Sequence, residues 1–317
     1  MRALLVVNPK ATTTSGRGQD VLARALRSEV DLEVEYTRRR GHAAELARRA
    51  VKDGLDVVVT LGGDGTVNEV VNGLLADVPL ATGPDDDTAR PAVPMLAVVP
   101  GGSTNVFARA LGLPGDWADG TGVILEALRE GRTRSIGLGR VNERWFTFCA
   151  GFGLDAEVIR RVERARVRGR VSTPGLYLRS AVAQYFAASD RRGPLISLER
   201  DGAEAEHGLG TVIVQNTAPW TYLGNRPVNP NPDASFDLGL DVLATRGQGL
   251  PSTVRTAAQM LSRQADPHGR RVLRLHDLDG FALRAQRPVA FQVDGDYLGE
   301  REHLRFRAEP QALRVVC

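Results

Sequence analysis

The sequence has 317 residues, with 42% hydrophobic residues, 25% charged residues and a net charge of +3. These ordinary values exclude a disordered or fibrous chain, and the length suffices for about two domains with their own cores. Two cysteines, Cys149 and Cys317, are too few for a disulfide framework, so we expect a cytoplasmic protein. The sequence contains no apolar stretch of the ~18 residues that a spanning helix needs, so any membrane contact is expected to be peripheral.

In the first part of the chain, up to about Leu113, short β-branched runs alternate with longer amphipathic ones. This alternation predicts an α/β domain with a parallel sheet. Leu4–Val7 and Val57–Val59 are apolar without alternation, which is typical of strands buried on both faces. The predicted elements in chain order are strand Ala3–Val7, helix Gly18–Glu29, strand Leu32–Thr37, helix His42–Asp53, strand Val57–Leu61, helix Thr66–Leu75, strand Met95–Val99, helix Asn105–Leu111 and helix Trp117–Glu130.

The alternation of predicted strands and helices ends near residue 135, where we expect a domain boundary. Beyond it, many short strands joined by turn residues predict a mostly β domain, interpreted as a sandwich. Residues Pro79 to Pro94, with four prolines, are predicted to be an exposed loop without an assigned role. The predicted strands are Trp145–Ala150, Leu195–Glu199, Thr211–Gln215, Leu238–Ala244, Val272–Leu275, Phe281–Ala285, Val289–Val293 and His303–Arg307, and the predicted helices are Asp155–Val167, Gly175–Ser189 and Ser252–Arg263.

The motif with the strongest chemical meaning is Gly62-Gly63-Asp64-Gly65-Thr66-Val67-Asn68-Glu69, which follows a predicted strand and opens a helix. Glycines at such a turn let the backbone approach a ligand, and the helix N-terminus favours phosphate. An aspartate beside phosphate is expected when Mg²⁺ lies between them. The motif therefore predicts a metal-bridged nucleotide, with a tight turn carrying a solvated aspartate as the alternative.

Two further motifs fall at the same predicted sheet edge. Pro100-Gly101-Gly102-Ser103-Thr104-Asn105 follows the strand Met95–Val99 and precedes a helix, so its hydroxyls suit phosphate or simple helix capping. Asn8-Pro9-Lys10 ends the first strand, where an Asn-Pro turn is also common for structural reasons alone. In open α/β sheets, ligands bind at the carboxyl ends of strands.

Together these motifs resemble the diacylglycerol kinase catalytic domain, shared with sphingosine kinases and bacterial lipid kinases. The resemblance implies a kinase with ATP and Mg²⁺ as cofactors, an ATP-binding domain made of residues 1–134 plus about 309–317, and a lipid-substrate domain over residues 135–308. The resemblance also implies that Thr37, which precedes Gly41-His42-Ala43, contacts ATP. The expected nucleotide-binding residues are Asn8, Pro9, Lys10, Thr37, Gly62, Gly63, Asp64, Gly65, Thr66, Asn68, Glu69, Gly102, Ser103, Thr104 and Asn105.

The resemblance also implies two catalytic carboxylates, Asp296 as general base and Asp64 as the residue that aligns phosphate through a metal. Asp296 lies in Asp294-Gly295-Asp296, where many relatives read Asp-Gly-Glu, and an acidic turn is the alternative. The expected metal ligands are Asp64 and Asp237. Acidic positions of well-studied bacterial relatives are replaced at Val106, in Ile136-Gly137-Leu138 and in Phe236-Asp237-Leu238-Gly239, which favours a catalytically silent sensor as one alternative.

The predicted function is therefore an ATP-dependent lipid kinase acting on diacylglycerol or a related lipid. The alternatives are an NAD kinase-like enzyme, which shares the Gly-Gly-Asp-Gly loop, and the silent lipid or nucleotide sensor. The arginine-rich run Arg160–Arg170 suits anionic lipid or a solvated helix face. No aromatic platform accompanies it, so nucleic acid is not an expected partner. The expected partners are a lipid substrate, a peripheral membrane surface at the inner face and, as an option, a second copy.

Overall fold

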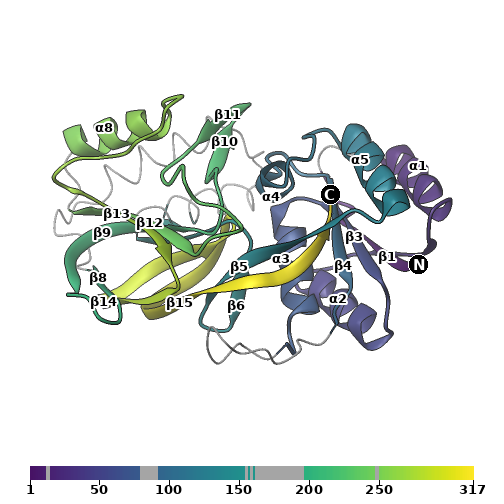
Figure 1. Ribbon diagram of the computed structural model, residues 1–317, viewed down its shortest axis with the longest axis horizontal. Helices are drawn as coiled ribbons and strands as arrows, with labels where there is room; N and C mark the ends of the chain where they lie inside the picture. Colours follow the sequence, from purple (N-terminus) through teal and green to yellow (C-terminus); the bar gives the residue numbers. More distant parts are fainter. Residues whose placement is uncertain (12–14, 79–91, 154–155, 158–159, 161–195, 247–249) are drawn as a thin grey trace. The chain divides into compact units, whose positions relative to one another are not determined.

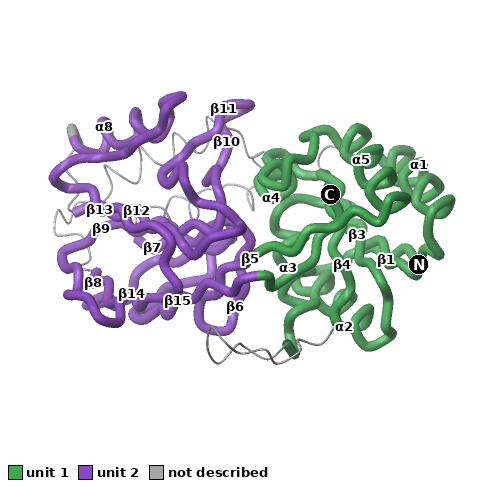
Figure 2. Tube along the Cα trace, in the orientation of Figure 1, with its two compact units in different colours: residues 1–136, 311–317 green, residues 137–310 purple. Residues whose placement is uncertain are grey.

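The computed structural model describes residues 1–11, 15–78, 92–153, 156–157, 160, 196–246 and 250–317 (Figure 1). The chain divides into two compact units (Figure 2). Unit 1 comprises Met1–Ile136 and Gln311–Cys317, and unit 2 comprises Gly137–Pro310. Among the helices of the described residues, none is long and apolar enough to cross a bilayer.

Unit 1 is built on four parallel strands in the order β4-β3-β1-β2. Their bounds are β1 Arg2–Val7, β2 Asp31–Tyr36, β3 Val57–Gly62 and β4 Met95–Pro100. All six residues of β3 are buried, in agreement with its continuous apolar run. Parallel pairing brings the carboxyl ends of the strands to one edge of the sheet, which is where the sequence motifs follow.

Five helices of the described residues accompany this sheet, and Figure 1 shows α1 beside α5 and α2 beside α3. Gly73 explains how closely α2 and α3 approach, because a Cβ at this position would lie 2.3 Å from the Ala44 carbonyl oxygen. Ser15 begins α1 as its N-cap, since its hydroxyl accepts a hydrogen bond from the Gly18 N–H at 3.2 Å. The bounds are α1 Gly16–Arg27, α2 His42–Lys52, α3 Asp64–Leu74, α4 Val106–Ala110 and α5 Trp117–Glu130.

Unit 2 is rich in strands, as expected. Its strands are β5 Thr133–Val141, β6 Arg144–Phe146, β7 Cys149–Gly153, β8 Ile196–Glu199, β9 Glu206–Gln215, β10 Thr221–Leu223, β11 Arg226–Val228, β12 Leu240–Arg246, β13 Val272–Leu278, β14 Gly280–Val293 and β15 Asp296–Val316, with helix α8 Leu250–Met260. The strands β13-β12-β9-β7-β14-β15 are consecutive neighbours in a larger hydrogen-bonded sheet, in which β8 also pairs with β9 and β14. Among the described residues, β10 and β11 form a separate ribbon. The interpretation as a sandwich stays a prediction.

The core of unit 2 gathers apolar side chains from most of these strands. Phe306 of β15 stacks on Phe281 of β14, with ring centroids 4.9 Å apart, and meets the edge of Phe146 at 6.2 Å. Both Phe152 of β7 and Leu283 of β14 are fully buried in the same cluster. This continuous core explains why the second half of the chain forms a compact unit.

The structure corrects two predicted strand boundaries in unit 2. Trp145–Ala150 is not one strand, because the N–H groups of Thr147 and Phe148 leave the ladder and donate to the Asp294 carboxylate, which separates β6 from β7. Phe281–Ala285 and Val289–Val293 are not two strands, because β14 continues through both with a register shift between Arg284 and Val289. Pro288 lacks an N–H, and here it marks an irregularity within a strand instead of a turn.

Strands β5 and β15 each contribute residues to both units. Within β15, residues up to Pro310 belong to unit 2 and the last residues to unit 1, where Val315 pairs in parallel with Leu96 of β4. The strands β5, β10 and β11 and the full length of β15 were not predicted. The predicted helix Gly175–Ser189 and nearly all of Asp155–Val167 and of the loop Pro79–Pro94 lie outside the described residues.

Candidate functional site

The two glycine loops meet at the carboxyl ends of β3 and β4. The Gly101 N–H donates to the Gly62 carbonyl oxygen at 2.8 Å. A Cβ at Gly101 would lie 2.9 Å from the Gly62 nitrogen, and a Cβ at Gly102 would lie 2.7 Å from the Gly63 Cα. These positions therefore need glycine for loop packing, whether or not a ligand approaches.

The end of β1 joins the same edge through Asn8. Its backbone N–H donates to the Leu61 carbonyl oxygen at 2.9 Å, and its side-chain amide donates to the Thr66 hydroxyl at 3.2 Å. Its own amide oxygen accepts from the Lys10 N–H at 3.0 Å, which shapes the turn around Pro9. Asn8 thus links β1, β3 and α3, while the Lys10 side chain is exposed.

Asp64 caps a helix other than its own. Its two carboxylate oxygens accept hydrogen bonds from the backbone N–H groups of Val106 at 3.1 Å and Phe107 at 3.0 Å, the first residues of α4. A carboxylate is favourable there because a helix N-terminus carries unpaired N–H groups and a partial positive charge. The N-cap residue Asn105 adopts a left-handed φ of 50° and exchanges two 2.8 Å hydrogen bonds with Gly102 instead. Asp64 therefore joins α3 to α4.

Glu69 plays the same structural part for α2. Its carboxylate accepts from the Gly41 N–H at 2.8 Å and from the Ala43 N–H at 3.2 Å. The N-cap position of α2 is Gly41, which has no side chain to cap the helix. Thr37 lies just before this turn, with its N–H donating to the Val7 carbonyl oxygen at 2.8 Å. The carboxyl end of β2 is thereby held beside that of β1.

The remaining predicted residues of unit 1 differ in exposure. Ser103 is exposed, Gly65 and Thr104 are half-buried, and Asn68 is buried. The Asn68 carbonyl oxygen accepts from the Asn72 amide at 2.8 Å. The structure thus gathers every predicted nucleotide-binding residue at or beside the carboxyl edge of the unit 1 sheet. Their contact with a nucleotide stays a prediction.

Asp64→Ala is expected to lower the free energy of unfolding by about 1–2 kcal/mol, because two N–H groups of α4 lose their acceptor. We also expect phosphate transfer to be lost. Asp116→Ala is the matched control, since Asp116 caps α5 by accepting from Ala118 and Asp119 at 2.8 and 3.3 Å. Urea unfolding and transfer assays should show similar stability losses for both, with activity lost only for Asp64. Equal activities would remove Asp64 from the catalytic residues.

In unit 2, the turn between β14 and β15 carries Asp294 and Asp296. Asp296 is the first residue of β15 and is half-buried. Asp294 is buried, with a left-handed φ of 47°, and its carboxylate accepts four hydrogen bonds at 2.8–3.0 Å. The donors are the N–H groups of Thr147, Phe148 and Cys149 and the Thr147 hydroxyl. This anchor holds the turn that bears the predicted general base, and the sequence analysis did not identify it.

Burial raises the pKa of the Asp294 carboxyl, and the three backbone N–H groups with the Thr147 hydroxyl act against that shift. All four partners are donors, so the arrangement matches an ionised carboxylate, which only accepts hydrogen bonds. The Gly295 N–H adds a further link by donating to the Gln292 side-chain oxygen at 2.9 Å.

Comparison with known proteins agrees with the motifs in unit 1. Residues 2–141 match the sequence model of the diacylglycerol kinase catalytic domain. The diacylglycerol kinase of Staphylococcus aureus (strain MRSA252) is 33% identical over 158 residues, which cover 48% of this chain and 44% of that protein. The enzyme of Staphylococcus haemolyticus (strain JCSC1435) is 33% identical over 157 residues, covering 48% and 41%. The chain therefore spans less than half the length of these relatives, and the resemblance expected from the motifs is confirmed.

Solved structures extend the likeness to the fold of nearly the whole chain. A diacylglycerol kinase of Bacillus anthracis str. Sterne has a TM-score of 0.70 at 18% identity, covering 99% of this chain and 96% of that one. An NAD kinase from Archaeoglobus fulgidus in complex with ATP has a TM-score of 0.54 at 12% identity, covering 100% and 94%. At these identities the likeness shows the fold alone. The fold is of the expected type, which diacylglycerol kinases and NAD kinases share.

The predicted metal ligands lie in different units. Asp64 belongs to the part that matches the diacylglycerol kinase catalytic domain, and Asp237 is an exposed residue of unit 2 whose N–H donates to the Ser235 hydroxyl at 3.3 Å. Among the described residues, His, Cys, Asp and Glu side chains form no group of three or more that could hold a metal ion. A carboxylate oxygen can accept more than one interaction, so the contacts of Asp64 are compatible with an ion held mainly by phosphates.

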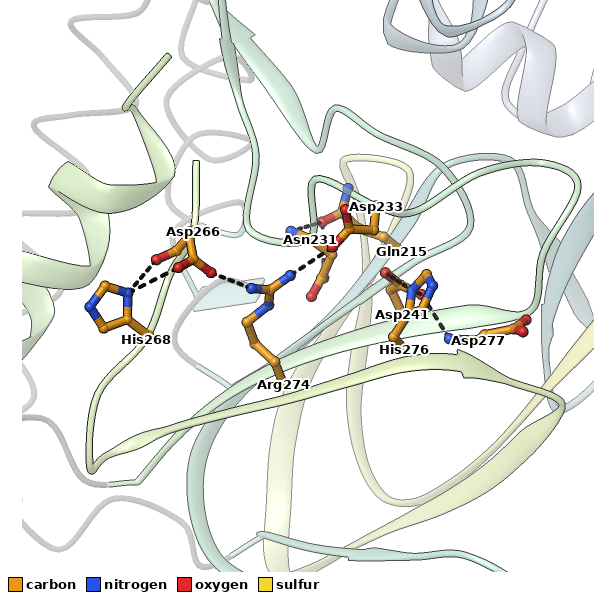
Figure 3. A network of polar contacts seen from close by, with 9 residues as sticks. All are labelled: Gln215, Asn231, Asp233, Asp241, Asp266, His268, Arg274, His276 and Asp277. Carbon is orange, nitrogen blue, oxygen red and sulfur yellow. Dashed lines mark hydrogen bonds and ion pairs between the residues drawn. The ribbon is translucent and has the colours of Figure 1, made fainter. Parts of the chain in front are cut away.

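Unit 2 contains a second polar network, centred on Asp241 and His276, that the sequence did not predict (Figure 3). His276 of β13 contacts the buried carboxylate of Asp241 on β12, with Nδ1–oxygen distances of 2.8 and 2.9 Å. Asp241 also accepts from the Asp277 N–H at 3.0 Å, and Asp277 accepts from the Gly239 N–H at 2.7 Å. Nothing in the sequence signals this pair, because the two residues are 35 positions apart and meet only through strand pairing.

The hydrogen bond with Asp241 raises the pKa of His276 above its ordinary value of 6.5, against the effect of partial burial and with further help from Asp241, Asp233 and Asp277 as charges. Because the pKa of His276 is higher in the folded state than in the unfolded state, its protonation stabilises the fold. This stabilisation is complete below pH 6.5 and is lost as the pH rises through the folded-state pKa. Because the His276 side chain is 50% exposed, we expect an effect below about 1 kcal/mol. Urea unfolding from pH 6 to 9 should show a decline for the wild type that His276→Gln lacks, and parallel curves would contradict it.

Proposed function

We propose that this protein is an ATP-dependent lipid kinase that transfers the γ-phosphate to a hydroxyl of diacylglycerol or a related lipid. The match of residues 2–141 to the diacylglycerol kinase catalytic domain carries this proposal. The glycine loops after β3 and β4, with Asn8 and Thr37 at the same edge, support it chemically. In this proposal unit 1 binds ATP and unit 2 binds the lipid.

Positioning and charge neutralisation account for most of the rate in phosphoryl transfer. The glycine loops offer backbone N–H groups close to the N-terminus of α3, which suits phosphate oxygens. The lone acidic side chain in that first turn, Asp64, is the candidate ligand of a Mg²⁺ ion, which would neutralise phosphate charge when bound with ATP. Asp296 would accept the proton of the attacking lipid hydroxyl. The hydroxyl oxygen of the lipid would form the new bond to the γ-phosphorus while ADP departs.

The test is transfer from labelled ATP to a panel of hydroxyl lipids in mixed micelles with Mg²⁺, with NAD as an additional acceptor, resolved by chromatography. A labelled lipid would support the proposal and name the acceptor. Labelled NAD alone would favour the NAD kinase-like alternative, which the fold likeness to an NAD kinase supports. ATP binding without any labelled product would favour the silent sensor and overturn the proposal.

We also propose that the protein acts from the cytoplasm by peripheral contact with the inner membrane face. This follows from the proposed acceptor, since a hydroxyl lipid resides in a bilayer. A homodimer stays an expectation, which sedimentation velocity at several protein concentrations would test.

A further inference from the structure

The ribbon β10–β11 and the end of helix α8 pack together within unit 2 (Figure 1). The Asn229 N–H, just after β11, donates to the Met260 carbonyl oxygen at 2.9 Å, and the Arg226 guanidinium donates to the Leu261 carbonyl oxygen. Val228 and Met260 share an apolar cluster that also contains Trp220 and Leu261. We call residues 221–228 and 252–271 the ribbon–helix surface.

This surface has a strong excess of positive charge. It contains five arginines and one aspartate, so its formal charge is 5 − 1 = +4 without its histidine. All five arginines are exposed, and none forms an ion pair with a carboxylate of the described part of the chain; they are Arg226, Arg255, Arg263, Arg270 and Arg271.

The carboxylates nearby are occupied by another arginine. Arg274 contacts Asp266 at 2.7 Å and Asp233 at 3.1 Å, as Figure 3 shows. Asp266 also contacts His268 at 3.4 Å. These acidic groups are therefore held by Arg274 and His268, so within the described part of the chain they do not neutralise the five surface arginines.

Two exposed apolar side chains belong to the same two segments as these arginines. Leu223 is 40% exposed and Val254 is 59% exposed. Leu223 is directly paired with Arg226 across the ribbon, so the two side chains share one of its faces. Val254 precedes Arg255 on α8. Both elements thus carry an exposed apolar group and an exposed cation, a combination that suits the boundary between lipid headgroups and acyl chains.

We propose that the ribbon–helix surface docks onto a bilayer that contains anionic phospholipids. The proposal rests on the proposed lipid kinase function in its choice of partner, while its charge argument comes from the residues alone. A basic residue near an anionic bilayer contributes about fivefold to binding at moderate salt, so several arginines with two apolar contacts suffice for reversible attachment. A second copy of the chain is a poorer partner for this surface, because two such surfaces repel each other.

The experiment is flotation of the 317-residue chain with vesicles of phosphatidylcholine alone or mixed with phosphatidylglycerol. We expect the wild type to prefer the anionic vesicles at least about tenfold. Arg255→Glu with Arg263→Glu should weaken that binding at least about tenfold at low salt, and high salt should remove the difference. The matched control is Arg301→Glu with Arg305→Glu, which makes the same charge change at exposed positions of β15 and should have an effect below about threefold.

A second pair of changes tests the apolar contacts. Leu223→Ser with Val254→Ser should weaken vesicle binding severalfold at every salt concentration, because apolar burial is not screened. Circular dichroism and thermal unfolding would verify that each variant is folded.

Three outcomes would overturn the docking proposal. These are no preference of the wild type for anionic vesicles, equal losses in the test and control arginine pairs, and an arginine effect on self-association in sedimentation without one on vesicles. Transfer to a short-chain, water-dispersed diacylglycerol is measured separately and should be unchanged in the Arg255/Arg263 variant. Lack of transfer by the wild type together with normal vesicle binding would end the proposed function and leave the docking surface in place.

Discussion

Replacing Asp294 with alanine is expected to lower the free energy of unfolding by at least about 4 kcal/mol. The carboxylate is buried and accepts from Thr147, Phe148 and Cys149. In the alanine variant three backbone N–H groups and a hydroxyl would lose their acceptor, and each buried unsatisfied donor costs about 1–3 kcal/mol. Relaxation or entry of water would recover part of that sum. Urea unfolding followed by circular dichroism would measure the loss.

Asp277→Ala is the matched control for this change. Asp277 also has a left-handed backbone, with φ 55° against 47° for Asp294, so both variants put alanine in the same unfavourable conformation. The Asp277 side chain, however, is exposed and accepts one backbone N–H, from Gly239. We expect a loss of about 1–2 kcal/mol there. Similar losses in the two variants would mean that backbone conformation, not the set of buried hydrogen bonds, explains the importance of Asp294.

The described strands and helices up to Glu130 were predictable because their signals are local. The strand Val57–Val59 is apolar on both faces and the helix Trp117–Glu130 begins after an aspartate cap and ends at Gly131, so pattern and caps agree with the structure. In unit 2 the local signal is weaker. The irregular part of β14 at Pro288 resembles a turn in sequence, and β10 and β11 have three residues each. Such short strands carry too few side chains for a period to be recognised.

The long-range caps could not be predicted. Asp64 caps a helix that begins 42 residues later, and Glu69 caps one that begins about 28 residues earlier. Sequence rules for helix ends compare residues within about three positions, so they interpret both carboxylates only as first-turn or helical residues. The motif that predicted phosphate chemistry therefore also contains two residues that hold the surrounding helices, and substitutions there change both stability and binding.

The contacts of Asp294 are even longer-range in the sequence, so local sequence rules could not predict them. The sequence indicated an acidic turn and directed attention to Asp296, which the structure shows to be half-buried. Asp294, two positions earlier, is buried. Its hydrogen-bond donors Thr147, Phe148 and Cys149 precede it in the sequence by 147, 146 and 145 positions. Only the pairing of β14 with β7 brings these donors to the turn. The two aspartates of one short motif thus differ in environment, because Asp294 is buried among four hydrogen-bond donors and Asp296 is only half-buried.

Asp296→Asn is expected to lower the rate of lipid phosphorylation by about 10²–10⁴-fold while the affinity for ATP stays unchanged, since an amide cannot accept the proton of the attacking hydroxyl. Single-turnover transfer and calorimetry with a non-hydrolysable ATP analogue would separate the two effects. Asp296→Glu restores a carboxylate and should recover much of the rate. Asp201→Asn, at an exposed turn of unit 2, is the control for loss of one negative charge and should keep the wild-type rate. A wild-type rate in Asp296→Asn would exclude this residue as the base, and the Asp294 turn would then serve structure alone.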